Sequence, residues 1–205
     1  MGCLFIVTAP SGAGKTSLIR ALLERETGLA LSVSCTTRAP RPGEVPGRDY
    51  HFIDKTEFEA RRARGEFLEW AEVYGNLYAT PKAPIEASLT GRDTDLIFEV
   101  DWQGARRIQA AYPEAASIYI LPPSPEVLEA RLRARATDSE EVIARRLRQL
   151  ADDVRHVTNF GYVIVNHHFD EALENLRAII RAERCRSRRI PASLLEQFHG
   201  THHSG

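Results

Sequence analysis

The residues from Ala9 to Thr16 have the types and order of a loop that binds phosphate groups. They read A-P-S-G-A-G-K-T, directly after the apolar run C-L-F-I-V-T and directly before a helical pattern. In such a loop, backbone N–H groups point at the phosphates and the following helix adds partial positive charge. Lys15 would contact the β and γ phosphates, and the Thr16 hydroxyl would bind Mg²⁺. The loop therefore predicts a site for a nucleoside triphosphate. The predicted residues are Ala9, Pro10, Ser11, Gly12, Ala13, Gly14, Lys15 and Thr16.

The first position of this loop departs from the usual pattern, which asks for glycine where this chain has Ala9. A tight turn from a strand into a helix would give a similar sequence without binding phosphate. The position of the loop between a strand pattern and a helix pattern favours the phosphate site.

A second group of residues could bind another phosphate. Arg38 and Arg41 lie three residues apart in a proline-containing segment, and Tyr50 follows nearby. Guanidinium groups bind phosphate with two parallel hydrogen bonds, and a phenol can add a third. The alternative is that these arginines are ordinary solvated surface residues.

Glu69 is a candidate for reading a nucleobase. It lies in the segment G-E-F-L-E-W-A-E-V-Y-G-N-L-Y-A-T-P-K, together with Tyr78 and Thr80. A carboxylate accepts hydrogen bonds only, so it matches the N1–H and the exocyclic amine of guanine and repels the bare N1 of adenine. On spacing alone, a solvated glutamate is the alternative.

The composition describes the kind of chain that carries these groups. Of 205 residues, 43% are hydrophobic and 27% charged, which is typical of a soluble globular protein. The formal net charge of −1 gives no general attraction to nucleic acid or to membranes. Lysine occurs three times and all other basic side chains are arginine, a bias that suits phosphate binding but that genome base composition would also produce.

The chain is expected to be cytoplasmic. It contains no apolar stretch long enough to span a membrane, and its first apolar run is too short for a signal peptide. Cys3, Cys35 and Cys185 fit neither a disulfide framework nor a zinc site, so we expect reduced thiols.

Short apolar runs alternate with longer amphipathic segments, which predicts a parallel sheet flanked by helices. The predicted strands are 4–8, 31–34, 95–100, 117–121 and 162–165. The predicted helices are 15–25, 125–135, 139–157 and 170–188. Ser124 before Pro125, and Asp138 or Ser139 before two glutamates, are typical helix starts.

Two regions break this alternation. Residues 35–87 contain several prolines and glycines, with aromatic residues separated by polar ones, so an inserted antiparallel subdomain fits better than a further strand and helix. Residues 191–205 show no sustained pattern and are expected to be disordered.

Several motifs in order resemble the guanylate kinase family of nucleoside monophosphate kinases, bacterial type. Besides the phosphate loop they are T-T-R-A-P-R-P-G-E, G-E-F-L-E-W-A-E-V-Y-G-N-L-Y, V-D-W-Q-G-A, I-L-P-P-S and D-S-E-E-V-I-A-R-R-L. The resemblance covers residues 3–188. It implies an α/β fold with a P-loop NTPase parallel sheet core (1–34, 88–124 and 158–190), a mixed GMP-binding insert (35–87) and a helical lid with its flanking helices (125–157).

The resemblance also implies a role for individual residues. The implied guanine site consists of Ser34, Glu69, Thr80 and Asp101. The implied site for the GMP phosphate consists of Arg38, Arg41, Tyr50 and Tyr78. Asp101 could equally order the water around Mg²⁺, and the sequence does not separate the two roles.

The implied lid contributes three arginines that close over the transferring phosphates. Arg131 and Arg135 lie four residues apart and therefore share a helix face, and Arg146 follows on the next helix. Lys15, Arg38, Arg135 and Arg146 would stabilise the charge of the transition state. The nucleophile would be a phosphate oxygen of GMP, which is already ionised at neutral pH, so no general base is expected.

The chain departs from the family at several positions. Ala9, Ala79 and Ala136 replace glycines, and His167 and His168 replace two aspartates. Adjacent residues of an extended segment point to opposite sides, so the two histidines are not expected to share a metal. Ala136 would restrict a lid hinge that needs positive φ.

The expected reaction is transfer of a phosphoryl group from ATP, with Mg²⁺, to GMP or dGMP, giving ADP and GDP. Two alternatives remain: an interaction module that keeps the fold without catalysis, and a kinase of another nucleotide or sugar phosphate. The sequence leaves the oligomeric state open.

Overall fold

A five-stranded parallel sheet forms the centre of this computed structural model, which describes residues 2–73, 75–90, 94–134, 139–190 and 192–199. The strand order is β2-β7-β1-β8-β9. The strands are β1 (Leu4–Thr8), β2 (Leu29–Ser32), β7 (Asp95–Glu99), β8 (Ala116–Leu121) and β9 (Tyr162–Val165). All residues of β1 are buried, as expected of a central strand with helices on both faces. The predicted parallel sheet is confirmed, although β2 begins and ends two residues before the predicted strand.

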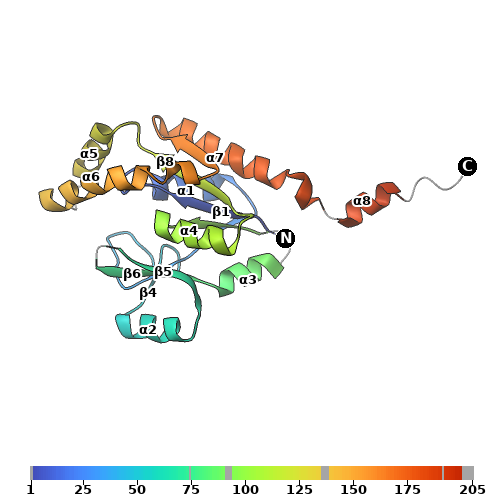
Figure 1. Cartoon of the computed structure of the whole chain (residues 1–205), viewed down its shortest axis with the longest axis horizontal. Helices are drawn as coiled ribbons and strands as arrows, with labels where there is room; N and C mark the ends of the chain where they lie inside the picture. Colours follow the sequence, from blue (N-terminus) through green and yellow to red (C-terminus); the bar gives the residue numbers. More distant parts are fainter. Residues whose placement is uncertain (1, 74, 91–93, 135–138, 191, 200–205) are drawn as a thin grey trace, which may run out of the picture.

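Helices cover both faces of this sheet (Figure 1). On one face, α1 (Lys15–Arg25) and α7 (Phe169–Arg184) pack on Phe5 and Val7 of β1. On the other face, α3 (Ala83–Thr90) and α4 (Trp102–Ala111) pack on the alternate residues of the same strands. The alternating side chains of one central strand thus belong to two separate cores.

The insert forms a second sheet, which lies apart from the first one in Figure 1. Its order is β4 (His51–Phe52), β3 (Cys35–Thr36), β6 (Asn76–Pro81) and β5 (Phe67–Val73). The sheet is mixed, because β3 and β4 run parallel. The mixed insert that the family resemblance implies is confirmed. The antiparallel arrangement that the composition favours holds for two strand pairs but is wrong for β3 and β4, because the long connection 37–50 returns the chain in the same direction, as parallel neighbours require. Helix α2 (Lys55–Ala63) covers one face.

The lid region consists of α5 (Pro125–Ala134) and α6 (Glu140–Val154), which pack on each other through leucine and isoleucine side chains. Both predicted serine starts are confirmed. Ser124 Oγ accepts from the backbone N–H of Val127 at 3.3 Å, and Ser139 Oγ accepts from that of Val142 at 3.4 Å. A short 3₁₀ turn, η1 (Val157–Asn159), leads from α6 to β9. The predicted residues Arg135 and Ala136 lie outside the described residues.

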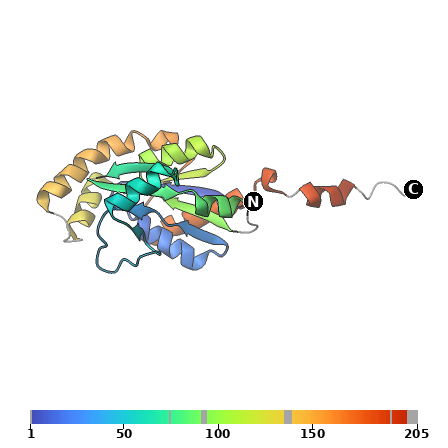
Figure 2. The same cartoon turned by 90° about the horizontal axis from the view of Figure 1, so that it is seen from below.

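Part of the tail differs from the prediction of disorder, because α8 (Ala192–His199) follows the turn η2 (Ser187–Arg189). Residues 191 and 200–205 lie outside the described residues. Leucine, glutamate and glutamine favour helix, but the segment is too short for a periodic pattern to reveal this. The helix projects away from the sheets (Figure 2). Its Phe198 is 70% exposed. Within the described part of the chain, no helix combines the length and the apolar character that crossing a membrane requires.

Candidate active site

A cleft of about 360 Å³ lies between the phosphate loop, the insert and the lid. It opens at the carboxyl ends of β1 and β7, where ligands bind in open α/β sheets. Most of the predicted site residues line it, together with several that were not predicted. The predicted residues in the lining are Ala9, Pro10, Ser11, Gly12, Gly14, Lys15, Thr16, Ser34, Arg41, Tyr50, Glu69, Tyr78, Asp101 and Arg146.

The phosphate loop needs its two glycines. Gly12 has φ 96° and Gly14 has φ 99°, in the left-handed region that other residues avoid. Gly14 is also crowded, since a Cβ there would lie 2.6 Å from Nδ2 of Asn166. That same amide donates to the carbonyl of Ala13 at 2.8 Å. The asparagine after β9 therefore supports the loop, a role that was not predicted from the sequence.

Lys15 and Thr16 begin α1 at the mouth of the cleft. Lys15 Nζ donates to the carbonyl of Val100 at 2.9 Å and lies 4.0 Å from a carboxylate oxygen of Glu99. The Thr16 hydroxyl donates to the same carboxylate. Glu99 was missed, although its place at the end of the strand beside the loop strand is a detectable signal. Hydroxyl and carboxylate oxygens suit Mg²⁺. Among the described residues, no group of three or more His, Cys, Asp or Glu side chains could hold a metal ion.

The predicted acceptor-phosphate residues come together in the insert. Arg38 lies over the ring of Tyr50, with 5.5 Å from Cζ to the centroid, and the rings of Tyr50 and Tyr78 are 6.0 Å apart. Arg38 donates to both carboxylate oxygens of Glu44, at 2.8 and 3.1 Å. The backbone N–H of Arg41 donates to Glu44 at 2.7 Å. Glu44 therefore orients the guanidinium of Arg38 and holds the backbone at Arg41. It too was missed, although it ends the motif R-P-G-E.

The pKa of Glu44 reflects these contacts. Burial opposes ionisation, but the hydrogen bonds from Arg38 and from the backbone of Arg41 outweigh it and lower the pKa of the carboxyl. For Tyr50, burial first and the charge of Glu99 second raise the pKa. The Tyr50 phenol therefore remains a hydrogen-bond donor at neutral pH.

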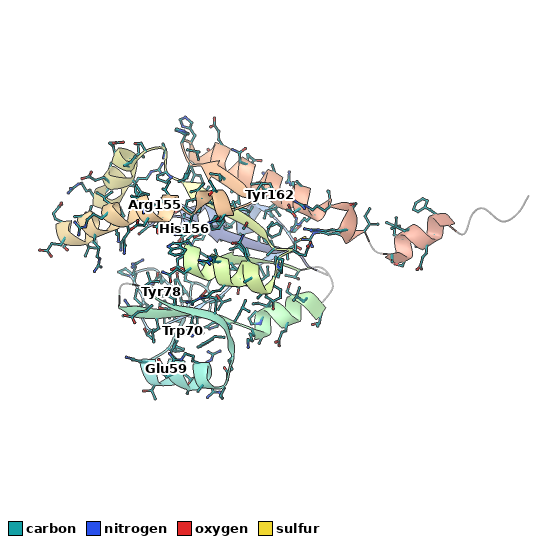
Figure 3. The ribbon with its side chains drawn as sticks, viewed as in Figure 1. Glu59, Trp70, Tyr78, Arg155, His156 and Tyr162 are labelled. Carbon is teal, nitrogen blue, oxygen red and sulfur yellow. The ribbon has the colours of Figure 1, made fainter. Side chains whose placement is uncertain are left out.

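A β-bulge turns Glu69 into the cleft. The register of β5 shifts between Phe67 and Glu69, so that Phe67 packs on Phe58 of α2 while Glu69 faces α4. Figure 3 shows the same two-sided arrangement, with Tyr78 toward the main sheet and Trp70 toward α2. The insert thus has one structural face and one face that lines the cleft.

The predicted guanine residues have different relations to Glu69. Thr80 donates to its carboxylate at 2.5 Å, and Ser34 lines the same cleft. Asp101 caps α4 by accepting from the backbone N–H of Gly104 at 2.8 Å. Burial raises the pKa of Glu69, and the charge of Asp101 adds to this against the opposing effects of Thr80 and Arg107.

Helix α6 of the lid contacts the phosphate loop through an arginine side chain. Arg146 Nη1 on α6 donates to Ser11 Oγ at 2.9 Å. Arg131 on α5 donates to the backbone carbonyl of Asn166 at 3.1 Å, so it lies on the outer side of the loop. A second cavity of about 390 Å³ lies there, beside the exposed ring of Phe169. The structure therefore places the two described lid arginines, Arg131 and Arg146, on different sides of the loop.

One face of α6 lines the cleft with Arg146, Gln149 and Asp153. Burial, with the charges of Asp101 and Asp152, raises the pKa of Asp153 to about 6, against the opposing charge of Lys15. Asp153 was not predicted, because a carboxylate in a charged amphipathic helix gives no signal of its own in the sequence.

The residues that differ from the family pattern lie at three kinds of position. Ala9 lines the cleft, and Ala79 is buried in β6 between Cys35 and Trp70. His167 and His168 are exposed where α7 begins. Ala136 falls outside the described residues.

Comparisons with known proteins agree with this site. A family model described as guanylate kinase matches residues 1–183. A guanylate kinase of Aromatoleum aromaticum is 55% identical over 186 residues, 90% of each chain, and that of Dechloromonas aromatica is 54% identical over 182 residues, 88% of this chain and 89% of the relative. The crystal structure of guanylate kinase from Anaplasma phagocytophilum has a TM-score of 0.78 and 34% identity, covering 92% of this chain and 89% of that one. The phosphate loop, the insert and the lid thus all fall within the matched length, and the chain belongs to the guanylate kinase family.

Proposed function

We propose that this chain transfers the γ-phosphoryl group of ATP to GMP, giving ADP and GDP. The observation that carries the proposal is the composition of one cleft. Lys15 of the phosphate loop, the Arg38–Tyr50–Tyr78 group of the insert and the carboxylate of Glu69 all border it or lie directly behind its wall. Transfer between two phosphates requires both to lie in one water-poor space.

The donor lies on the loop. The first turn of α1 has no side-chain cap, so its N–H groups and the ammonium of Lys15 serve the β and γ phosphates. The second cavity, beside Arg131 and Phe169, takes the nucleoside end of ATP. Thr16, with Glu99 behind it, would hold Mg²⁺ together with phosphate oxygens. When bound, the ion neutralises charge on the β and γ phosphates.

The acceptor lies on the insert. Arg38, Arg41, Tyr50 and Tyr78 hold the phosphate of GMP, while Ser34, Glu69, Thr80 and Asp101 surround its base. Glu44 keeps Arg38 in reach before GMP binds. Guanine presents two adjacent N–H donors to the Glu69 carboxylate, a pattern that adenine lacks.

The chemistry needs positioning and positive charge. Because a phosphate monoester is largely ionised at neutral pH, the GMP oxygen attacks without a general base. Lys15, Arg38 and Arg146 supply charge to the equatorial oxygens, and we assign the same role to Arg135 from the family resemblance. We place the reaction in the cytoplasm, where three unpaired cysteines such as these are ordinary.

A coupled assay of ADP release with GMP, dGMP, AMP, CMP and UMP tests the proposal. GMP and dGMP should both give the highest kcat/KM, with similar values, because the cleft is assigned no contact to the 2′-hydroxyl. AMP should be slower by at least about tenfold, the discrimination that one charged hydrogen-bonding group supplies. Equal use of AMP and GMP would contradict the assignment.

A further inference from the structure

The carboxylate of Glu69 is in an unfavourable place for a negative charge. Its side chain is only 5% exposed, and Asp101 at the start of α4 adds repulsion. A protonated Glu69 would present an O–H donor to the N1–H of guanine and lose one of two acceptors. Recognition of guanine therefore depends on whatever stabilises the anion.

Arg107 is the cation that faces this carboxylate. Its Nη1 lies 4.0 Å from Oε2 of Glu69. Arg107 follows Gly104 by three residues on α4, so the two share a helix face, and Gly104 is the point where that face touches Glu69.

Arg107 approaches from outside the cleft. Its side chain is 48% exposed, and the described residues that line the cleft do not include it. The groups that act on Glu69 are thus Thr80 from β6, Asp101 and Arg107 from α4. Of these, only Arg107 among the described residues brings positive charge.

We propose that Arg107 is a positioning residue for base recognition: from behind the cleft wall it holds Glu69 as an anion, in place to accept both guanine donors. This inference rests on the proposed assignment of Glu69 to guanine. It adds a specificity-determining residue that does not itself touch GMP.

The test is the pH profile of kcat/KM for GMP between pH 5 and 8.5, measured for the wild type and for Arg107→Gln. The variant should move the acid limb upward by about half a pH unit, because an ion pair with a half-exposed arginine shifts a carboxyl only modestly. KM for GMP should rise near pH 6, while kcat at saturating GMP and KM for ATP stay within twofold. The phosphate of GMP titrates identically for both proteins, so their difference reports the enzyme.

Two variants control for charge and for structure. Arg106→Gln removes the same charge from an exposed neighbouring position of α4 and should leave the profile unchanged. Arg107→Lys keeps the charge and should restore the wild-type limb. An unchanged limb in Arg107→Gln, or the same shift in Arg106→Gln, would overturn the inference.

A double-mutant cycle separates this inference from the assignment beneath it. In a Glu69→Gln background, Arg107→Gln should have no further effect on GMP use, because no carboxylate remains to be held. An equal loss in both backgrounds would show a role unrelated to Glu69. If Glu69→Gln alone leaves GMP use unchanged, the guanine assignment itself fails.

Discussion

We assign base selection to the carboxylate of Glu69, which accepts from Thr80 on one side and borders the cleft on the other. In Glu69→Gln, the amide must present a donor to guanine or turn away. We expect kcat/KM for GMP to fall at least tenfold and the discrimination against AMP to shrink. Steady-state kinetics with both nucleotides measures this. A loss below about threefold, worth under ~1 kcal/mol, would refute the assigned role.

Phe169 is the side chain through which the donor base can be tested. Its ring is 41% exposed and lines the second cavity beside Arg131. Loss of an aromatic surface for base stacking costs about 1–3 kcal/mol. Phe169→Ala should therefore raise KM for ATP by about fivefold or more and leave KM for GMP unchanged.

Val163→Ala is the matched control for that variant, because Val163 is similarly exposed, at 45%, and does not belong to the described lining of the cavity. Equal KM values for ATP in Phe169→Ala and the wild type would show that the adenine of ATP does not bind in this cavity.

At the scale of residues, the sequence predicted the groups that carry recognisable chemistry and missed their partners. Lys15, Arg38 and Glu69 stand in motifs whose residue types indicate phosphate or base binding. Glu44 and Asn166 act by orienting other residues, and no spacing rule connects them with the residues that they orient. Such partners become visible only when the fold brings distant segments together.

At the scale of elements, helix α6 bears a carboxyl group, that of Asp153, whose pKa is raised in the folded chain. Asp153 has a pKa of about 6 in the folded chain, against roughly 4 in an unfolded one. Between these values the folded state binds more protons, so its stability falls as pH rises and the loss is complete above pH 6. Asp153→Asn removes the charge and should stabilise the protein at pH 7 by about 1–2 kcal/mol, after allowance for solvent screening.

Urea unfolding at pH 7 and at pH 4.5 measures this effect. The gain should shrink at pH 4.5, where folded Asp153 is already protonated. A gain that is equal at both pH values, or a loss at pH 7, would show that the Asp153 carboxylate is not destabilising in the folded chain. A fall in kcat that accompanies the gain would indicate that the lid helix keeps this charge for catalysis.

Elements whose apolar residues recur at a regular spacing were predictable from the sequence, and elements shaped by tertiary contacts were not. Helix α1 has its predicted bounds, since an amphipathic pattern and the loop before it fix its start. The bulge in β5 that separates Phe67 from Glu69 leaves no trace in the sequence, because it depends on two faces packing against different partners. The parallel pairing of β3 with β4 escaped prediction for the same reason.

At the scale of the whole molecule, the sheet order is what brings the two nucleotide sites together. Strands β1 and β7 are neighbours, so the phosphate loop after β1 lies beside Glu99, the last residue of β7, and Asp101, which follows it. The insert meets this edge through β5, which packs on α4. Alternation of apolar and amphipathic segments predicted the parallel sheet, whereas the way the insert packs on it required the structure.

The central claim is that ATP and GMP occupy separate sites on opposite sides of one transfer point. Lys15→Ala tests it most directly, with Lys55→Ala as a control that removes the same charge from the exposed start of α2. Transfer should fall by at least about 10²-fold in the Lys15 variant, since it loses a cation on the transferring phosphate. Equilibrium titration should show GMP binding within about threefold of wild type in both variants. A Lys15 variant whose GMP affinity falls as far as its activity would contradict the two-site account.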